Sequence, residues 1–159
     1  MAFIHDNFLL NNDRAIELYH RYAADQPIID YHNHLPPAEI AQDQKYENIT
    51  QLWIAGDHYK WRAMRTHGID EHYITGRASD KEKFVAWATT VPHTLRNPLF
   101  HWTHLELKRY FDIDEFLSPD NASRLYHQMN ERLKEDAYSC RGLLKRMNVR
   151  YLCTTEDPM

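Results

Sequence analysis

The chain has 159 residues, 43% of them hydrophobic and 13% aromatic, which is enough to bury one ordinary domain core. Its net charge of −4 is spread over mixed signs, which excludes a basic nucleic-acid face and a polybasic membrane anchor. The longest apolar runs are only a few residues, far too short for a membrane span. The chain has only 4 glycines, which disfavours Gly-rich phosphate loops.

Helix signals open the chain. Asn12 and Asp13 can cap a helix that runs to about residue 25, where Gln26 and Pro27 end it. A short apolar strand follows at once and stops at a double proline, residues 36–37.

This strand carries a His-x-His pair. Side chains alternate along a strand, so His32 and His34 should project from the same face at its end. Two imidazoles in that position can supply two of the bonds that a divalent metal needs. The alternative is a purely structural pair, because the motif is short and the chain holds 11 histidines.

The next 110 residues or so are predicted to be helical. The clearest start signals are a capping box at Ser79, proline in the first turn after Asn97 and after Ser118, and a serine cap at Ser139. These predict helices from residue 80 to near Pro92, from 98 towards 111, from 119 to about 136, and through 146.

A second strand is predicted over residues 149–155, which are β-branched and apolar, and we expect it to be buried. Glu156 and Asp157 follow it, in a position typical of catalytic residues in a parallel barrel, although capping a following helix is the favoured role. Two strands make no stable sheet alone, so we expect the sequence to be a piece of a longer α/β protein, with a large helical insertion in its first βα unit.

A basic cluster lies at a probable helix start, residues 56–65. His58 and Tyr59 offer a proton-transfer pair, and Arg62 and Arg65 could hold a carboxylate bidentately. The alternative is an amphipathic helix whose tryptophan and methionine pack inward while the basic residues face water.

A second histidine pair lies on a predicted helix. His101 and His104 are three residues apart and therefore share a face. Nothing nearby supplies a third metal ligand, so packing with hydrogen-bonded imidazoles is the favoured interpretation.

Together these segments resemble one family, the uronate (glucuronate) isomerases of the amidohydrolase superfamily. The blocks that carry the resemblance cover nearly the whole chain: IDYHNHLPP at 29–37, GDHYKWRAMR at 56–65, FVAWA at 84–88, NPLFHWTHLEL at 97–107 and TTEDP at 154–158. The resemblance implies the N-terminal part of a metal-dependent (β/α)₈ TIM barrel, with residues 1–37 as the first helix and strand, 38–147 as a helical insertion and 148–159 as the second strand. The implied reaction interconverts D-glucuronate with D-fructuronate and D-galacturonate with D-tagaturonate.

The resemblance also assigns roles to residues. His32 and His34 match metal ligands, with zinc as the usual metal, while His58, Tyr59 and Arg62 belong to the substrate-contacting motif. In the family the tyrosine is implicated in opening the sugar ring, and the histidine lies near the substrate carboxylate. The last metal ligand, an aspartate on the eighth strand, is absent here, and so are the arginines that grip the carboxylate. We therefore expect these 159 residues to be inactive alone.

Two other readings stay open. A metal-dependent hydrolase or deaminase of the same superfamily would also use the His-x-His pair, and a helical binding module would use it only structurally. The N-terminus shows no secretory signal, and the two cysteines, Cys140 and Cys153, form no C-x-x-C pair, which favours a cytoplasmic protein. Open strand edges tend to pair, so homo-oligomerisation is one way to cover them.

Overall fold

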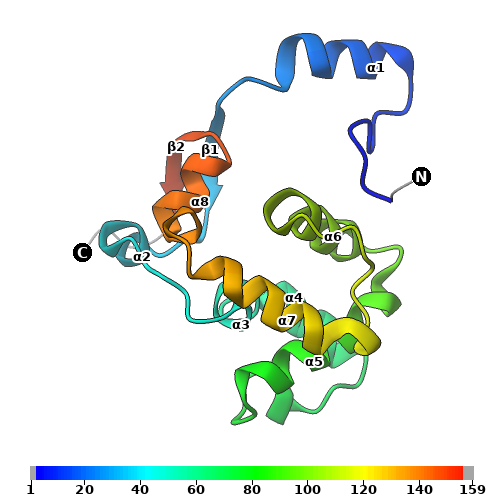
Figure 1. Cartoon of the computed structure of the whole chain (residues 1–159), viewed down its shortest axis with the longest axis vertical. Coiled ribbons are helices and arrows are strands. Elements are labelled where there is room, and N and C mark those ends of the chain that lie inside the picture. Colours follow the sequence, from blue (N-terminus) through cyan, green and yellow to red (C-terminus); the bar gives the residue numbers. More distant parts are fainter. Residues whose placement is uncertain (1–2, 156–159) are drawn as a thin grey trace. The chain divides into compact units, whose positions relative to one another are not determined.

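The structure, a computed structural model, describes residues 3–155 (Figure 1). The chain divides into two compact units. The helical unit comprises Tyr46–Lys134 with Phe3 and Ile4, and the strand unit comprises His5–Lys45 with residues 135–155. No helix within the described residues is long and apolar enough to cross a membrane.

Within the described residues, the strand unit contains both strands and five short helical pieces. Asn12 caps the first helix by accepting a hydrogen bond from the Ala15 amide at 2.9 Å, as its sequence position predicts. The elements are α1 (Asp13–Leu18), a π-helical turn (Tyr19–Ala23), β1 (Ile28–Asn33), α2 (Pro37–Gln42), a 3₁₀ turn (Asp136–Tyr138), α8 (Cys140–Arg146) and β2 (Val149–Thr154).

The two strands lie side by side and run parallel (Figure 1), with Ile28 opposite Val149 and Asn33 opposite Thr154. The expected burial of the second strand is wrong for the described residues: Tyr151 on β2 is 70% exposed, and Ile29 on β1 is 64% exposed. The physical reason is that α8 packs on β2, while among residues 3–155 no other helix packs extensively on either strand.

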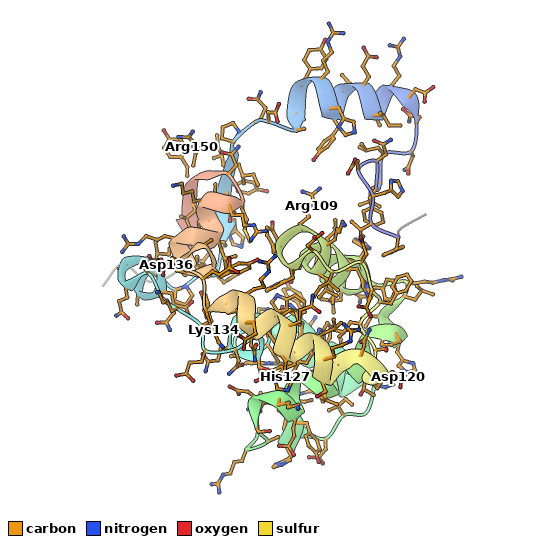
Figure 2. The ribbon with its side chains drawn as sticks, viewed as in Figure 1. Arg109, Asp120, His127, Lys134, Asp136 and Arg150 are labelled. Atoms are coloured by element: carbon orange, nitrogen blue, oxygen red, sulfur yellow. The ribbon has the colours of Figure 1, made fainter. Side chains whose placement is uncertain are left out.

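Polar contacts tie α2 and the residues that follow it to α8 and to the 3₁₀ turn before α8. The Arg141 guanidinium donates to the Ile40 carbonyl at 2.8 Å, and the Arg141 amide donates to the Asp43 carboxylate at 2.9 Å. Asp136 (Figure 2) accepts a hydrogen bond from Lys45 at 2.6 Å. These contacts join the two chain segments of the strand unit, His5–Lys45 and residues 135–155, although about 100 residues separate the bonded partners in sequence.

The helical unit is organised around α5 (Asp80–Thr90), which packs on α3 (Ile49–Trp53), α4 (His58–Thr66) and α7 (Pro119–Leu133). Trp87 and Phe84 of α5 are fully buried, as are Met64, Leu125 and Met129 from the helices around it. The remaining elements are α6 (Pro98–Phe111) and the 3₁₀ turns Glu71–Tyr73 and Val91–Thr94.

The predicted helix starts are confirmed at Ser79, Asn97, Ser118 and Ser139, each of which is an N-cap. The predicted end of α7 near residue 136 is too late. The helix stops at Leu133, and Glu135 adopts an extended conformation that breaks the helical path before the next 3₁₀ turn.

The capping box of α5 gives a stability prediction. Ser79 Oγ accepts from the Glu82 amide, and Glu82 accepts from the Ser79 amide at 2.8 Å. Replacing Ser79 with alanine should lower the free energy of unfolding by about 1 kcal/mol, measured by urea denaturation. Ser123→Ala, an exposed serine within α7, is the matched control and should be neutral or slightly stabilising.

Candidate active site

The His-x-His pair lies where β1 ends. The rings of His32 and His34 lie side by side, with centroids 5.2 Å apart and planes nearly perpendicular, as alternation along a strand predicts. Both side chains are exposed. Asp30 accepts a long hydrogen bond from the His32 amide at 3.4 Å, which helps to hold the last residues of the strand.

The end of β2 supports this pair. Thr155 donates its amide to the Asn33 carbonyl at 3.0 Å, and its hydroxyl lies 2.9 Å from Nδ1 of His34. Asn33 reaches back across the strands to the Cys153 carbonyl at 3.2 Å. The sequence did not single out Asn33 or Thr155, because only the strand register reveals that residues more than 100 positions apart meet here. Their signal is a polar side chain directly at the end of each apolar strand.

The donors present fit a metal in part. Two neighbouring imidazoles are suitable ligands for zinc and related divalent ions. Within residues 3–155, however, no group of three or more His, Cys, Asp or Glu side chains is arranged to hold a metal ion. His32 and His34 could therefore fill two coordination positions. Glu156 and Asp157 lie outside the described residues.

The second group of predicted residues begins α4. Asp57 caps this helix: its Oδ1 accepts from the amides of Tyr59 and Lys60 at 2.9 and 3.0 Å, and its Oδ2 accepts from Lys60 Nζ at 2.7 Å. Lys60 is only 8% exposed, and its ammonium lies 5.9 Å from the centre of the Trp87 ring. The first turn is thus anchored to α5 from the inside.

His58, Tyr59 and Arg62 lie on the other face of this helix and are exposed. Tyr59 is 57% exposed, and its ring centroid lies 4.6 Å from that of His58. The Arg62 guanidinium lies 5.7 Å from the centre of the Tyr59 ring. Trp61 turns inward and donates its indole N–H to the Ile54 carbonyl at 2.7 Å. The amphipathic-helix interpretation is confirmed, because Trp61 and Met64 turn inward while His58, Tyr59 and Arg62 face solvent; the proton-transfer role of His58 and Tyr59 stays a prediction.

The suggestion that Arg62 and Arg65 grip a carboxylate together needs correction. Arg65 is already paired with Glu71, through contacts of 2.8 and 2.6 Å. The Arg65 and Thr75 hydrogen bonds lower the pKa of Glu71 to about 2, so this carboxylate stays charged beside Arg65. Arg62 has no carboxylate partner among residues 3–155.

Buried charge lies behind the first turn of α4. Burial alone would raise the pKa of Asp57, but the Lys60 ammonium and the two amide hydrogen bonds hold it below its usual value. Burial raises the pKa of Glu106 on α6, against the attraction of the same ammonium. The Lys60 ammonium therefore favours the charged form of both carboxyl groups, Asp57 and Glu106. Sequence reasoning did not assign a role to Asp57, Lys60 or Glu106, because an isolated lysine in a basic helix looks solvent-exposed.

His101 and His104 do not form a metal site. His104 is buried, with Nδ1 2.6 Å from the Phe100 carbonyl and Nε2 accepting from the Leu117 amide at 3.1 Å. Both ring nitrogens are thus used, and the acceptor role of Nε2 selects the tautomer protonated on Nδ1. For His104 the packing interpretation is confirmed.

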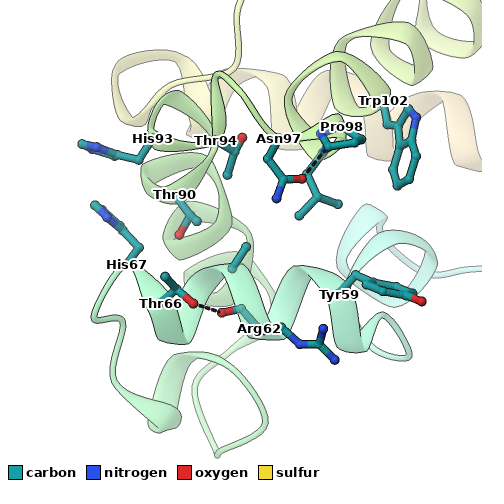
Figure 3. Close-up of a pocket in the computed structure, with 12 residues that line it drawn as sticks. Tyr59, Arg62, Thr66, His67, Thr90, His93, Thr94, Asn97, Pro98 and Trp102 are labelled. Atoms are coloured by element: carbon teal, nitrogen blue, oxygen red, sulfur yellow. Dashed lines mark hydrogen bonds between the residues drawn. The ribbon is translucent and has the colours of Figure 1, made fainter.

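A pocket of about 480 Å³ opens beside the exposed residues of α4 (Figure 3). Tyr59 and Arg62 line one wall, and the turn Val91–Thr94 and the start of α6 form the other. The structure thus brings His58, Tyr59 and Arg62 together in the helical unit, and His32 with His34 in the strand unit.

The parallel strand pair with its helical crossover defines an α/β protein. The sequence matches the glucuronate isomerase family model over residues 1–159, and the chain belongs to that family. It is 60% identical to the uronate isomerase of Flavobacterium johnsoniae over 158 residues, which is 99% of this chain, and 55% identical to that of Shouchella clausii over 157 residues. These matches confirm the family resemblance that the sequence motifs predict.

Solved structures agree. The uronate isomerase crystal structure from Thermotoga maritima superposes with a TM-score of 0.92 at 37% identity, covering 99% of this chain and 34% of that one. The glucuronate isomerase structure from Caulobacter crescentus gives a TM-score of 0.85 at 28% identity, covering 96% of this chain and 34% of that one. The chain spans about a third of the length of the curated relatives it matches, 34% in the case of the Flavobacterium protein.

Proposed function

We propose that this chain contributes to a uronate isomerase that interconverts D-glucuronate with D-fructuronate and D-galacturonate with D-tagaturonate. The observation that carries the proposal is the family match over residues 1–159, together with 54–60% identity to curated uronate isomerases. Among the described residues, His58 and Tyr59 form an exposed pair that is rigidly mounted on a capped helix, which suits contact with a small substrate.

The proposed architecture is a (β/α)₈ barrel. Residues 1–37 would supply the first helix and strand, 38–147 an insertion, and 148–159 the second strand. The parallel pairing of β1 with β2 supports this reading, because adjacent parallel strands joined by a helical crossover are the repeating unit of such barrels. The exposed Ile28, Ile29 and Tyr31 on β1 and Tyr151 on β2 would then be covered by further barrel elements.

His32 and His34 would hold a divalent metal, zinc by family resemblance, at the carboxyl end of β1. When bound, such an ion supplies Lewis-acid stabilisation of negative charge on substrate oxygens. Thr155 would serve this role by fixing the orientation of His34, since a hydrogen bond to one ring nitrogen sets which nitrogen faces a ligand, while Asn33 ties the ends of the two strands together.

The chain's own residues suit the proton transfers. Opening the sugar ring breaks the bond between C1 and the ring oxygen, so that oxygen gains a proton while the C1 hydroxyl loses one. Tyr59 can donate and accept such protons, and His58, whose ring centroid lies 4.6 Å from that of Tyr59, can donate a hydrogen bond to the substrate carboxylate. Isomerisation then moves a proton from C2 to C1 through an enediol, while a second proton moves from the C2 hydroxyl to the C1 oxygen.

A chimeric enzyme tests the proposal. The segment of the Flavobacterium johnsoniae uronate isomerase that matches this chain would be replaced by the present 159 residues, which are 60% identical to it. We expect D-glucuronate to be isomerised by the chimera, and Tyr59→Phe to reduce kcat by about 100-fold or more. Ser123→Ala is the control for changes that leave the site intact.

Two outcomes would contradict the proposal. One is a folded chimera, judged by circular dichroism and by its elution on gel filtration, that fails to isomerise either uronate. The other is a Tyr59→Phe chimera with unchanged kcat. An amidase or lactonase activity in place of isomerisation would favour the hydrolase alternative of the same superfamily.

A further inference from the structure

Two histidines at one end of the pocket beside α4 form a pair that the proposed function does not use. His67 is the C-cap of α4, and His93 lies in the turn Val91–Thr94. Their rings stack, with centroids 4.0 Å apart and planes 25° apart. Figure 3 shows both side chains at the end of the pocket opposite to Tyr59 and Trp102. The pair is therefore separate from the residues proposed to contact substrate.

The backbone holds both histidines in place. The His67 amide donates to the Ala63 carbonyl at 2.9 Å and so completes the last turn of α4. His93 lies between Val91, which is fully buried, and Thr94, whose hydroxyl donates to the Val91 carbonyl at 2.7 Å. Both α4 and this turn pack on α5. The two imidazoles thus have a common support, which lowers the cost of ordering them around a shared ligand.

The imidazoles of this pair are not committed to a protein partner. Among residues 3–155, neither the His67 ring nor the His93 ring makes a hydrogen bond or an ion pair. His104 differs, because both of its ring nitrogens are used within the fold. His93 is exposed and His67 is half-buried, so water and ions can reach the rings. Stacking occupies the ring faces and leaves the nitrogens, which lie at the ring edges, available as ligands.

The donor set selects the kind of ion. Imidazole suits Zn²⁺, Cu²⁺ and Ni²⁺, whereas Mg²⁺ and Ca²⁺ prefer carboxylate, carbonyl and water oxygens. None of the residues that line the pocket is Asp or Glu. Within residues 3–155, no third His, Cys, Asp or Glu side chain is placed to complete a metal site. Water would fill the remaining positions, so an ion held by two protein ligands should exchange readily and be lost on dialysis.

The spacing of the rings suits chelation. Two nitrogens that are each about 2 Å from one ion lie roughly 3–3.4 Å from each other. Rings with centroids 4.0 Å apart need only a small tilt of their nitrogen edges towards each other to reach this separation. Because the His93 side chain is exposed, this tilt disturbs no buried packing.

We propose that His67 and His93 form a two-histidine site for a late first-row divalent ion, tightest for Cu²⁺ and weaker for Ni²⁺ and Zn²⁺. The site shares no residue with the His32 and His34 pair or with the exposed residues at the start of α4. It therefore does not depend on the proposed isomerase function. A bound ion would tie the end of α4 to the turn before α6, and would stabilise the helical unit by binding the folded state.

The test is a Zn²⁺ titration of the 159-residue chain at pH 7.5, followed by NMR of the imidazole ring protons. The chain carries His32→Asn and His34→Asn, which removes the competing pair in the strand unit. The signals of His67 and His93 are assigned from their loss in His67→Asn and His93→Asn. We expect both signals to shift together with a single midpoint, and Mg²⁺ at the same concentrations to shift neither.

Removing one imidazole distinguishes a chelate from two independent rings. His93→Asn should weaken Zn²⁺ binding at His67 by about tenfold or more, because one of the two protein ligands is lost. His127→Asn removes an exposed histidine from α7 and is the matched control, so Zn²⁺ affinity at His67 should stay within about twofold. Because His93 and His127 are both exposed, neither substitution should prevent folding, and circular dichroism verifies this.

Three results would overturn the inference. They are shifts of the His67 and His93 signals no larger than that of His127, an unchanged Zn²⁺ affinity at His67 in His93→Asn, and an equal response to Mg²⁺. The first would show that the rings only stack. The titration reads binding in the chain itself, so its failure leaves the proposed isomerase function standing. An inactive folded chimera would in turn contradict that function and leave the two-histidine site standing.

Discussion

Replacing His104 with alanine is expected to lower the free energy of unfolding by about 3 kcal/mol, measured by urea denaturation at pH 7.5. The imidazole is 3% exposed and bridges α6 to the Leu117 amide, so its removal leaves both a cavity and an unpaired buried N–H group. His127→Ala, an exposed histidine on α7 (Figure 2), is the control and should change stability by about 0.5 kcal/mol or less. Equal effects of the two substitutions would contradict the bridging role.

The same histidine predicts a pH dependence. Burial lowers the pKa of His104, and the hydrogen bond to the Phe100 carbonyl only partly opposes this. The native state therefore keeps the ring neutral while the unfolded state takes up a proton below a pH of about 6.5, so stability should fall as pH falls from 7 towards 5. His104→Gln cannot titrate, and its stability should fall less over this range. An identical slope in both proteins would show that other groups dominate.

The second large effect is expected at Lys60. Lys60→Met should lower the free energy of unfolding by about 3 kcal/mol, because it leaves the Asp57 carboxylate unpaired and removes the ammonium that opposes the raised pKa of Glu106. A methionine is unbranched and only one atom shorter than lysine, so the loss reports mainly on charge.

A double-mutant cycle with Asp57→Asn isolates this pair. Asparagine still caps the helix, so the single change should affect mainly the ion pair. The double variant Asp57→Asn with Lys60→Met should be more stable than the sum of the two single losses predicts. Strict additivity would show that the 2.7 Å contact contributes no coupling energy to the fold.

The features that the sequence predicts correctly are those set by neighbouring residues. Serine and asparagine caps mark helix starts because each one satisfies amide groups two or three residues ahead. The side-by-side placement of His32 and His34 follows from strand alternation alone. The motif blocks predicted the family for the same reason, since each one is a short contiguous pattern.

The features that sequence reasoning missed depend on distant residues. Thr155 reaches His34 only through the register of two strands separated by the whole helical segment. Lys60 is buried because Trp87 on α5, a residue distant in sequence, covers it, while the nearby Asp57 neutralises its charge. The wrong expectation of a buried second strand has a related origin: an apolar strand pattern predicts burial, but the covering elements need not belong to the same segment.

The metal content of the chimeric isomerase tests most directly whether this chain supplies half of a metal centre. Elemental analysis would compare the purified chimera with a chimera in which His32→Ala and His34→Ala are combined, both after dialysis against metal-free buffer. We predict stoichiometric zinc or another divalent metal in the first and its loss in the second, because two of the protein ligands are gone. Equal metal content in two folded proteins would contradict the assignment of His32 and His34 as ligands.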